Sequence, residues 1–268
     1  MTLVAALQMT SGNRVEANLE QAERLIAEAA ERGARLAVLP ENFALMAGSD
    51  AERRAAAEPD GRGPIQDFLA AAARRHGLWL VGGTIPLQAP GEKVYAACLL
   101  FDARGERVAR YDKIHLFDVE LGNGERYFES NGIEAGRSPV VARTPFGNIG
   151  LSVCYDVRFP ELYRRLIDLG AEILVVPSAF TAYTGRAHWE ALVRARAIEN
   201  SVYVVAAAQT GRHPNGRETH GDSMIVGPWG EVIARLPQGS GVVLAECELE
   251  QVRKVRRQLP SIEHRRFR

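Results

Sequence analysis

The stretch GNIGLSVCYDVRFPE, residues 147–161, decides how this chain is expected to fold. Its apolar run from Ile149 to Val153 is typical of a buried strand, and Pro160 then opens a helical pattern. Cys154 stands between the two, at the carboxyl edge of a sheet, where open α/β folds bind their ligands. Since a helix N-terminus stabilises thiolate over thiol, Cys154 is a candidate nucleophile. A buried cysteine that only packs in the core is the alternative.

The composition of the chain excludes several classes of protein. Its 268 residues carry a formal net charge of zero, so no overall basic field indicates nucleic acid or a membrane surface as a partner. The chain has only three cysteines, a small and odd number that argues against a disulfide framework and indicates a reducing compartment. The sequence has neither a signal-peptide pattern nor an apolar run of about 20 residues. We therefore expect a cytoplasmic protein with one domain over residues 1–268.

The two halves of the chain repeat one pattern. GARLAVLPENF at residues 33–43 resembles GAEILVVPSAF at 170–180, and residues 79–84 resemble 203–208 in the same way. The apolar runs are continuous, as in parallel strands that are covered on both faces. This internal pseudo-repeat predicts an α/β fold in which two sheets pack face to face with helices outside, a four-layer αββα sandwich.

Two polar residues are further candidates for chemistry. Glu41 follows a buried strand and a proline, and desolvation there would raise the pKa of its carboxyl group and suit it to act as a general base. Lys113 is one of only three lysines among the 33 lysines and arginines. A compact charge at that position could face a developing oxyanion. The alternatives are a carboxylate in a surface ion pair and a solvated lysine.

Three motifs together carry a resemblance to a known family. LPEN at residues 39–42, YDKIHLFD at 111–118 and CYDVRFPEL at 154–162 resemble the nitrilase superfamily of carbon–nitrogen hydrolases. The resemblance continues through residues 187–190, 194–200 and 227–232, so it covers nearly the whole chain. It implies an αββα sandwich that forms a homodimer or a larger homo-oligomer. It also implies a Glu–Lys–Cys site made of Glu41, Lys113 and Cys154, with no metal and no cofactor.

The resemblance also implies a mechanism, amide hydrolysis through a cysteine thioester. The ammonium of Lys113 and the backbone N–H of Tyr155 would stabilise the tetrahedral oxyanion. A second active-site glutamate is expected in the polar loop from Asp118 to Pro139. The best match is Glu129, in FES at residues 128–130, and Glu125, four residues earlier, is the alternative. The role of this glutamate would be to orient the lysine.

The resemblance implies that the substrate is a small amide, and two further motifs indicate which class of amide. RAIE at residues 196–199 and AAAQTGRH at 206–213 are most similar to the deaminated glutathione amidase branch. Near neighbours are ω-amidases, which act on α-ketoglutaramate, and other aliphatic or N-carbamoyl amide hydrolases. The resemblance implies that Arg158, Phe180 and Thr184 hold the α-keto acid end of the substrate. An ion pair between Arg158 and Asp156, with a merely packed Phe180, is the alternative.

Two other classes of protein stay open at this point. One is a cysteine–histidine enzyme with His115 or His188 as the base, although neither lies in a recognisable Cys–His signature. The other is a binding scaffold without catalysis. Cys98 and Cys247 lie in apolar patterns and are expected to be inert core residues.

Overall fold

The structure, a computed structural model, describes residues 1–267 and contains two large mixed β-sheets. The first has the order β17-β1-β2-β3-β5-β4, with β6 beside β5. Its strands are β1 (Thr2–Gln8), β2 (Leu36–Val38), β3 (Trp79–Val81), β4 (Ile85–Gln88), β5 (Val94–Phe101), β6 (Arg107–Asp112) and β17 (Gly241–Cys247).

The second sheet has the order β16-β15-β12-β11-β10-β9. Its strands are β9 (Val140–Thr144), β10 (Gly147–Leu151), β11 (Ile173–Val175), β12 (Tyr203–Ala206), β15 (Ser223–Val226) and β16 (Val232–Leu236). Two small hairpins stand apart from the sheets, β7 (Asp118–Glu120) with β8 (Arg126–Phe128), and β13 (Thr210–Arg212) with β14 (Glu218–His220).

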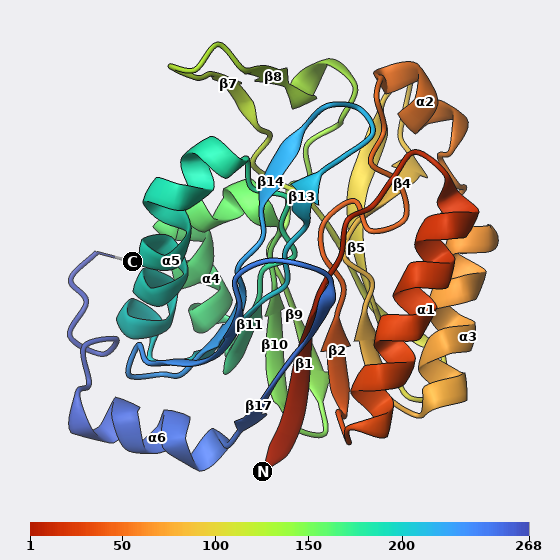
Figure 1. Cartoon of the computed structure of the whole chain (residues 1–268). Coiled ribbons are helices and arrows are strands. Elements are labelled where there is room, and N and C mark those ends of the chain that lie inside the picture. The colour runs from red at the N-terminus through yellow and green to blue at the C-terminus, as the bar shows by residue number, and fades with distance from the viewer. Residues whose placement is uncertain (268) are drawn as a thin grey trace.

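Helices lie on opposite sides of the strands (Figure 1). Helices α1 (Val15–Glu31) and α3 (Pro64–His76) lie on one side, and α4 (Pro160–Asp168) and α5 (Ala182–Asn200) lie on the other. The shorter helices are α2 (Asp50–Ala55), α6 (Leu249–Gln258) and the 3₁₀ helices η1 (Glu129–Asn131) and η2 (Cys154–Arg158). No helix within residues 1–267 is both long and apolar enough to cross a bilayer.

Alternate residues of β1 pack in two different cores, which explains its uninterrupted apolar sequence. Val4 and Ala6 belong to a core that also contains residues of β10, β11 and β12 in the second sheet. Ala5 and Leu7 belong to another core, with residues of α1 and α3. Both faces of the strand are therefore covered, as in other parallel sheets.

The repeated sequence corresponds to a repeated topology. Strand β2, which carries the first copy of the repeat, pairs in parallel with β1 and β3. Strand β11, which carries the second copy, pairs in parallel with β10 and β12. The predicted α/β class is thus confirmed, and both copies of the repeated sequence lie on strands with a parallel neighbour on each side. The expected loop from Asp118 to Pro139 is not wholly irregular, because backbone pairing forms the β7–β8 hairpin within it.

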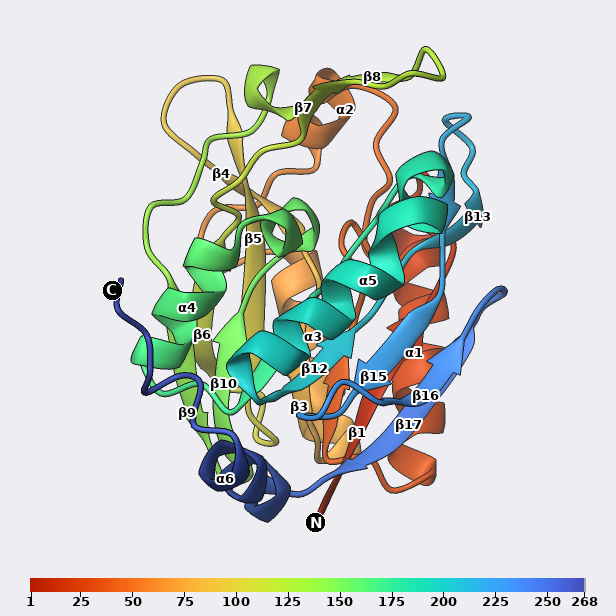
Figure 2. The ribbon, with the colours of Figure 1, turned by 90° about the vertical axis from the view of Figure 1, so that its left-hand side faces the viewer.

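The two hairpins mark one end of the molecule. Both β7–β8 and β13–β14 lie at the end toward which β1 runs, above the carboxyl ends of the parallel strands (Figure 2). Helix α5 begins at the same end, where the Thr181 side chain caps it by accepting a hydrogen bond from the backbone N–H of Thr184. The predicted site residues follow the strands at this end.

Candidate active site

A buried lysine joins two carboxylates beside the strand ends. The ammonium of Lys113, after β6, donates hydrogen bonds to Glu41 Oε1 at 2.8 Å and to Glu129 Oε2 at 2.7 Å. Lys113 is 1% exposed and Glu41 is 3% exposed, so the ion pairs are shielded from water. The structure therefore brings together three residues that the sequence placed far apart.

The Glu41 carboxylate is held from both sides. While Lys113 binds Oε1, the backbone N–H of Ala179 donates to Oε2 at 2.9 Å. The loop after β3 packs directly on the backbone before Glu41: Gly83 has a φ of 50°, and a Cβ added there would lie 2.0 Å from the Pro40 carbonyl oxygen. Only glycine fits that approach, so it helps to fix the segment that carries the carboxylate.

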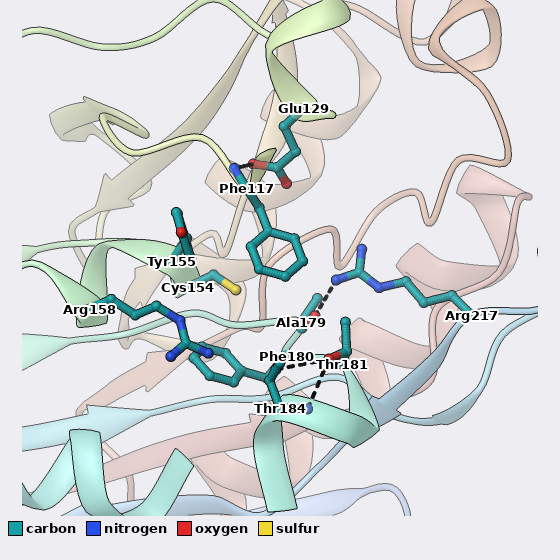
Figure 3. A pocket seen from close by; sticks show the side chains of 10 residues that line it. All are labelled: Phe117, Glu129, Cys154, Tyr155, Arg158, Ala179, Phe180, Thr181, Thr184 and Arg217. Carbon is teal, nitrogen blue, oxygen red and sulfur yellow. Dashed lines mark hydrogen bonds between the residues drawn. The ribbon is translucent and has the colours of Figure 1, made fainter. Parts of the chain in front are cut away.

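Cys154 lies at a strained corner between β10 and η2. Its φ of 48° places a non-glycine residue in the left-handed region, which persists only where the surroundings enforce it. One such restraint is the hydrogen bond from its backbone N–H to the Pro177 carbonyl oxygen, at 2.9 Å. The corner turns the thiol toward the cavity that Figure 3 shows.

The resting thiol is protonated, contrary to the expectation that the helix N-terminus would favour thiolate. Burial is the largest cause that raises the pKa of Cys154 well above its usual value, and the Glu41 charge adds to it. The Lys113 charge and the backbone of Ala179 act in the opposite direction without reversing the shift. The 3₁₀ helix η2 has only five residues, so its dipole is weak, and burial outweighs its effect on the pKa of Cys154. A base must therefore remove the proton during attack.

Glu129, and not Glu125, is the second carboxylate of the cluster. Besides Lys113, Glu129 Oε2 accepts a hydrogen bond from the Phe117 backbone N–H at 2.9 Å. Burial acts to raise the pKa of Glu129, but the Lys113 charge and hydrogen bond outweigh it, and the net shift is downward. Glu125 instead accepts hydrogen bonds from Asn123 and Tyr127.

The pKa of Lys113 moves in the opposite direction to that of Glu129. Burial, its largest influence, acts to lower the pKa of the ammonium, but the charges of Glu129 and Glu41 raise it, and the net shift is upward. Lys113 is therefore a permanent cation in the cluster.

Asp156 ties the lysine segment to the cysteine segment. It is fully buried and accepts hydrogen bonds from the Val153 backbone N–H at 2.8 Å and from Tyr111 Oη at 2.7 Å. It also accepts from the backbone N–H of His115 at 3.1 Å and lies 2.7 Å from His115 Nδ1. Asp156 does not pair with Arg158, so the alternative of a structural ion pair between those two residues is wrong.

The cavity at the thiol contains all three expected substrate-binding side chains (Figure 3). Arg158, Phe180 and Thr184 line it together with Cys154, and the Arg158 guanidinium carbon lies 5.1 Å from the centre of the Phe180 ring. The remaining lining residues are Phe117, Glu129, Tyr155, Ala179, Thr181 and Arg217. Its volume is only about 10 Å³, so a substrate enters only if lining side chains move.

Neither proposed histidine base lies in the wall of this cavity. His115 stacks on Phe159 with ring centres 3.7 Å apart and contacts Asp156. His188 Nδ1 lies 3.2 Å from Arg158 Nη1. Cys98 and Cys247 are buried core residues, as expected, and burial raises the pKa of Cys247 to about 12.

Sequence reasoning missed two contributions to the site. Ala179 supplies a backbone N–H to Glu41, which no side-chain pattern could reveal. Arg217 comes from the turn between β13 and β14, where no strand-end motif marks it. Among residues 1–267, no group of three or more His, Cys, Asp or Glu side chains is placed to hold a metal ion.

Comparison with known proteins agrees with this geometry. The sequence profile of the family described as carbon-nitrogen hydrolase matches residues 3–257. A deaminated glutathione amidase from Synechocystis sp. is 46% identical over 269 residues, which cover 99% of this chain and 98% of that protein.

Comparison with solved structures also indicates this family. The chain is similar to the C. elegans NitFhit protein with a TM-score of 0.91 and 40% identity, and it spans 99% of its own length but 65% of that protein's. A mutant amidase from Nesterenkonia sp. AN1, with acrylamide added at its active-site cysteine, matches with a TM-score of 0.78 and 26% identity; the match covers 97% of this chain and 98% of that one. With the profile match over most of its length and a full-length relative at 46% identity, the chain belongs to the carbon–nitrogen hydrolase family, within the nitrilase superfamily.

Proposed function

We propose that this chain is a thiol amidase that hydrolyses deaminated glutathione to 2-oxoglutarate and Cys-Gly. The observation that carries the proposal is the buried Lys113 ammonium, which binds the carboxylates of Glu41 and Glu129 beside the Cys154 thiol. The name of the Synechocystis relative supports the choice of substrate.

In the first step, Cys154 Sγ attacks the amide carbonyl carbon while Glu41 takes the thiol proton. This order follows from the raised pKa of the thiol, which keeps it neutral until a base is in contact. The carbonyl oxygen becomes an oxyanion, which Lys113 and the Tyr155 backbone N–H stabilise. When the tetrahedral intermediate collapses, Glu41 gives the proton to the leaving amine, and a thioester remains on Cys154.

In the second step, Glu41 accepts a proton from a water molecule that attacks the thioester. The same two donors stabilise the second oxyanion. When it collapses, the C–S bond breaks, Glu41 returns its proton to Cys154 Sγ, and the acid leaves. Losing one such donor typically costs about 10²- to 10³-fold in rate. Glu129 is a positioning residue, because it contacts Lys113 and not the thiol.

Arg158, Phe180 and Thr184 bind the α-keto acid end of the substrate in this proposal. A guanidinium can hold a carboxylate through two parallel hydrogen bonds, and Arg158 has no carboxylate partner among the ion pairs of residues 1–267. Phe180 is 6% exposed and Thr184 is 7% exposed, so both are buried parts of the wall.

The remaining expectations form part of the same proposal. We propose a single domain with a four-layer αββα sandwich, which the two cores and the outer helices support. The enzyme is proposed to work in the cytoplasm as a homodimer or larger homo-oligomer. Its reaction needs neither metal nor cofactor, because Glu41, Lys113 and Cys154 supply the base, the cation and the nucleophile.

The test is to incubate the purified protein with deaminated glutathione and to measure released 2-oxoglutarate. We expect turnover by the wild type and none by Cys154→Ala. A parallel assay with α-ketoglutaramate should give a lower kcat/KM. A higher value on α-ketoglutaramate would reassign the enzyme as an ω-amidase, and no turnover of either compound would contradict the proposed substrate class.

A further inference from the structure

A second arginine lines the cavity on the side opposite Arg158. In Figure 3 the Cys154 thiol lies between the two guanidinium groups, with Arg158 on the left and Arg217 on the right. Arg217 donates a hydrogen bond to the Ala179 carbonyl oxygen, and its guanidinium carbon lies 5.0 Å from the centre of the Tyr127 ring. The wall of the cavity at the thiol thus contains two cations.

Arg217 also lines the space outside the cavity. Two adjoining hollows, of about 470 and 260 Å³, share the lining residues Ala47, Gly48, Arg53, Arg126, Tyr127 and Arg217. We refer to them together as the outer cleft. The smaller hollow also reaches Glu41 and Glu129, and Arg158 does not line it. Arg217 therefore stands where the cavity at the thiol meets a space large enough for a substrate group.

The other two arginines that both hollows share are already paired, but Arg217 is not. Arg53 forms an ion pair with Asp50, and Arg126 lies 3.8 Å from a carboxylate oxygen of Glu120. Among the ion pairs within residues 1–267, none involves Arg217.

The hydrogen-bonding capacity of Arg217 is also incompletely used. Its buried Nε has no hydrogen-bond partner. A guanidinium has five N–H donors, and an unpaired donor in a buried site is costly. This group is therefore ready to receive an anionic acceptor.

We propose that Arg217 binds a carboxylate on the leaving amine of the substrate. The inference rests on the proposed function, in which Arg158 binds the carboxylate on the acyl side of the scissile bond. The preferred substrates are then amides with one carboxylate on each side of that bond, and the leaving group is an amino acid or a short peptide. Deaminated glutathione has this character through its terminal glycine, whereas α-ketoglutaramate releases only ammonia.

The test compares Arg217→Gln with the wild type on both compounds. On deaminated glutathione, kcat/KM should fall about 10- to 100-fold, as expected for the loss of a charge-assisted hydrogen bond. On α-ketoglutaramate it should change less than about twofold. Arg217→Lys should recover part of the loss. Arg212→Gln is the matched control, since Arg212 is an exposed arginine of the same hairpin that lines neither space.

A substrate variant completes the test. Deaminated glutathione with its glycine carboxylate converted to an amide should be cleaved by the wild type about 10- to 100-fold less well, and by Arg217→Gln no worse than the parent compound. Equal losses of Arg217→Gln on deaminated glutathione and α-ketoglutaramate would instead show that Arg217 only supports Ala179 and Glu41, and would overturn the proposal. If the wild type cleaved neither compound, the proposed function itself would fail.

Discussion

The ends of β2 and β11 have the same backbone plan but contribute to the site in different ways. After β2, the segment LPENF (39–43) supplies a side chain, the Glu41 carboxylate that binds Lys113. After β11, the segment VPSAF (176–180) supplies backbone groups: the Pro177 carbonyl accepts from Cys154, and the Ala179 N–H donates to Glu41. The two copies of the repeat thus have similar backbones. They differ at one matched position, Glu41 in the first copy and Ser178 in the second, and this difference determines which copy carries the charge.

The largest expected effect comes from substituting the residue at this matched position, first in one copy and then in the other. Glu41→Gln should lower kcat on the amide substrate by about 10²- to 10⁴-fold, because it removes the proposed proton acceptor and keeps the shape. Ser178→Ala is the matched change in the other copy and should leave kcat within about threefold, since the Ser178 hydroxyl only donates to the Val176 carbonyl oxygen. Single-turnover kinetics of both variants measure the chemical step. Similar losses in the two would contradict the division of roles.

The next effect concerns the free energy of unfolding. Lys113→Leu leaves Glu41 and Glu129 without their shared cation in a buried site, so we expect a loss of about 3–5 kcal/mol. Urea denaturation monitored by circular dichroism measures it. Lys93→Leu is the control, because Lys93 lies on the surface, 4.0 Å from Glu134, where an ion pair contributes about 0–1 kcal/mol. If Lys113→Leu lowered the free energy of unfolding only slightly, the buried carboxylates of Glu41 and Glu129 would not need the lysine charge for stability.

A smaller effect tests how the lysine segment is joined to the cysteine segment. Asp156→Asn replaces a buried acceptor of hydrogen bonds from Val153, Tyr111 and His115 by a group that also carries donors. We expect a loss of about 1–3 kcal/mol in stability and a fall in kcat, because the lysine segment separates from the cysteine segment. Tyr111→Phe removes one donor to Asp156 together with the acceptor of the Ile114 backbone N–H, and should cost about 1 kcal/mol. If Asp156→Asn lost stability but kept full kcat, Asp156 would have no positioning role.

Local sequence patterns were enough to predict the strand ends and the residues that follow them. Glu41 and Cys154 come shortly after the apolar runs of β2 and β10, which have parallel partners, so both lie at the carboxyl edges of the sheets. Lys113 follows β6, which is not an apolar run and pairs antiparallel with β5, so its place came from the family motif and not from strand geometry. The protonation state of Cys154 could not be predicted in this way, because it depends on burial and on the Glu41 charge, both of which are tertiary. Arg217 belongs to a hairpin turn without any periodic pattern, and only the packing of that hairpin over the cavity reveals it.

The resemblance favoured Glu129 over Glu125, but the local sequence pattern could not exclude Glu125. Both are acidic residues of one polar segment, four positions apart. Glu125 lies before β8 and binds Asn123 and Tyr127, whereas Glu129 begins η1 and points at Lys113. The register of the β7–β8 hairpin decides between them, and that register is set by backbone pairing rather than by a side-chain motif.

The smallest expected effect is a pH dependence that isolates Glu129. Its pKa in the folded protein lies below the ordinary value of 4.5, so the stability it contributes is present above pH 4.5 and is lost as the pH falls through its folded pKa. Glu129→Gln should therefore be less stable than the wild type at pH 7, and the difference should shrink on acidification. Urea denaturation at a series of pH values measures it, with Glu125→Gln as the control for a carboxylate of the same segment away from Lys113. Lys113 stays charged throughout this range, since its raised pKa lies far above it, so any convergence of the two curves reports the carboxylate alone. A difference that stayed constant with pH would show that Glu129 supports the cluster by packing and not by its charge.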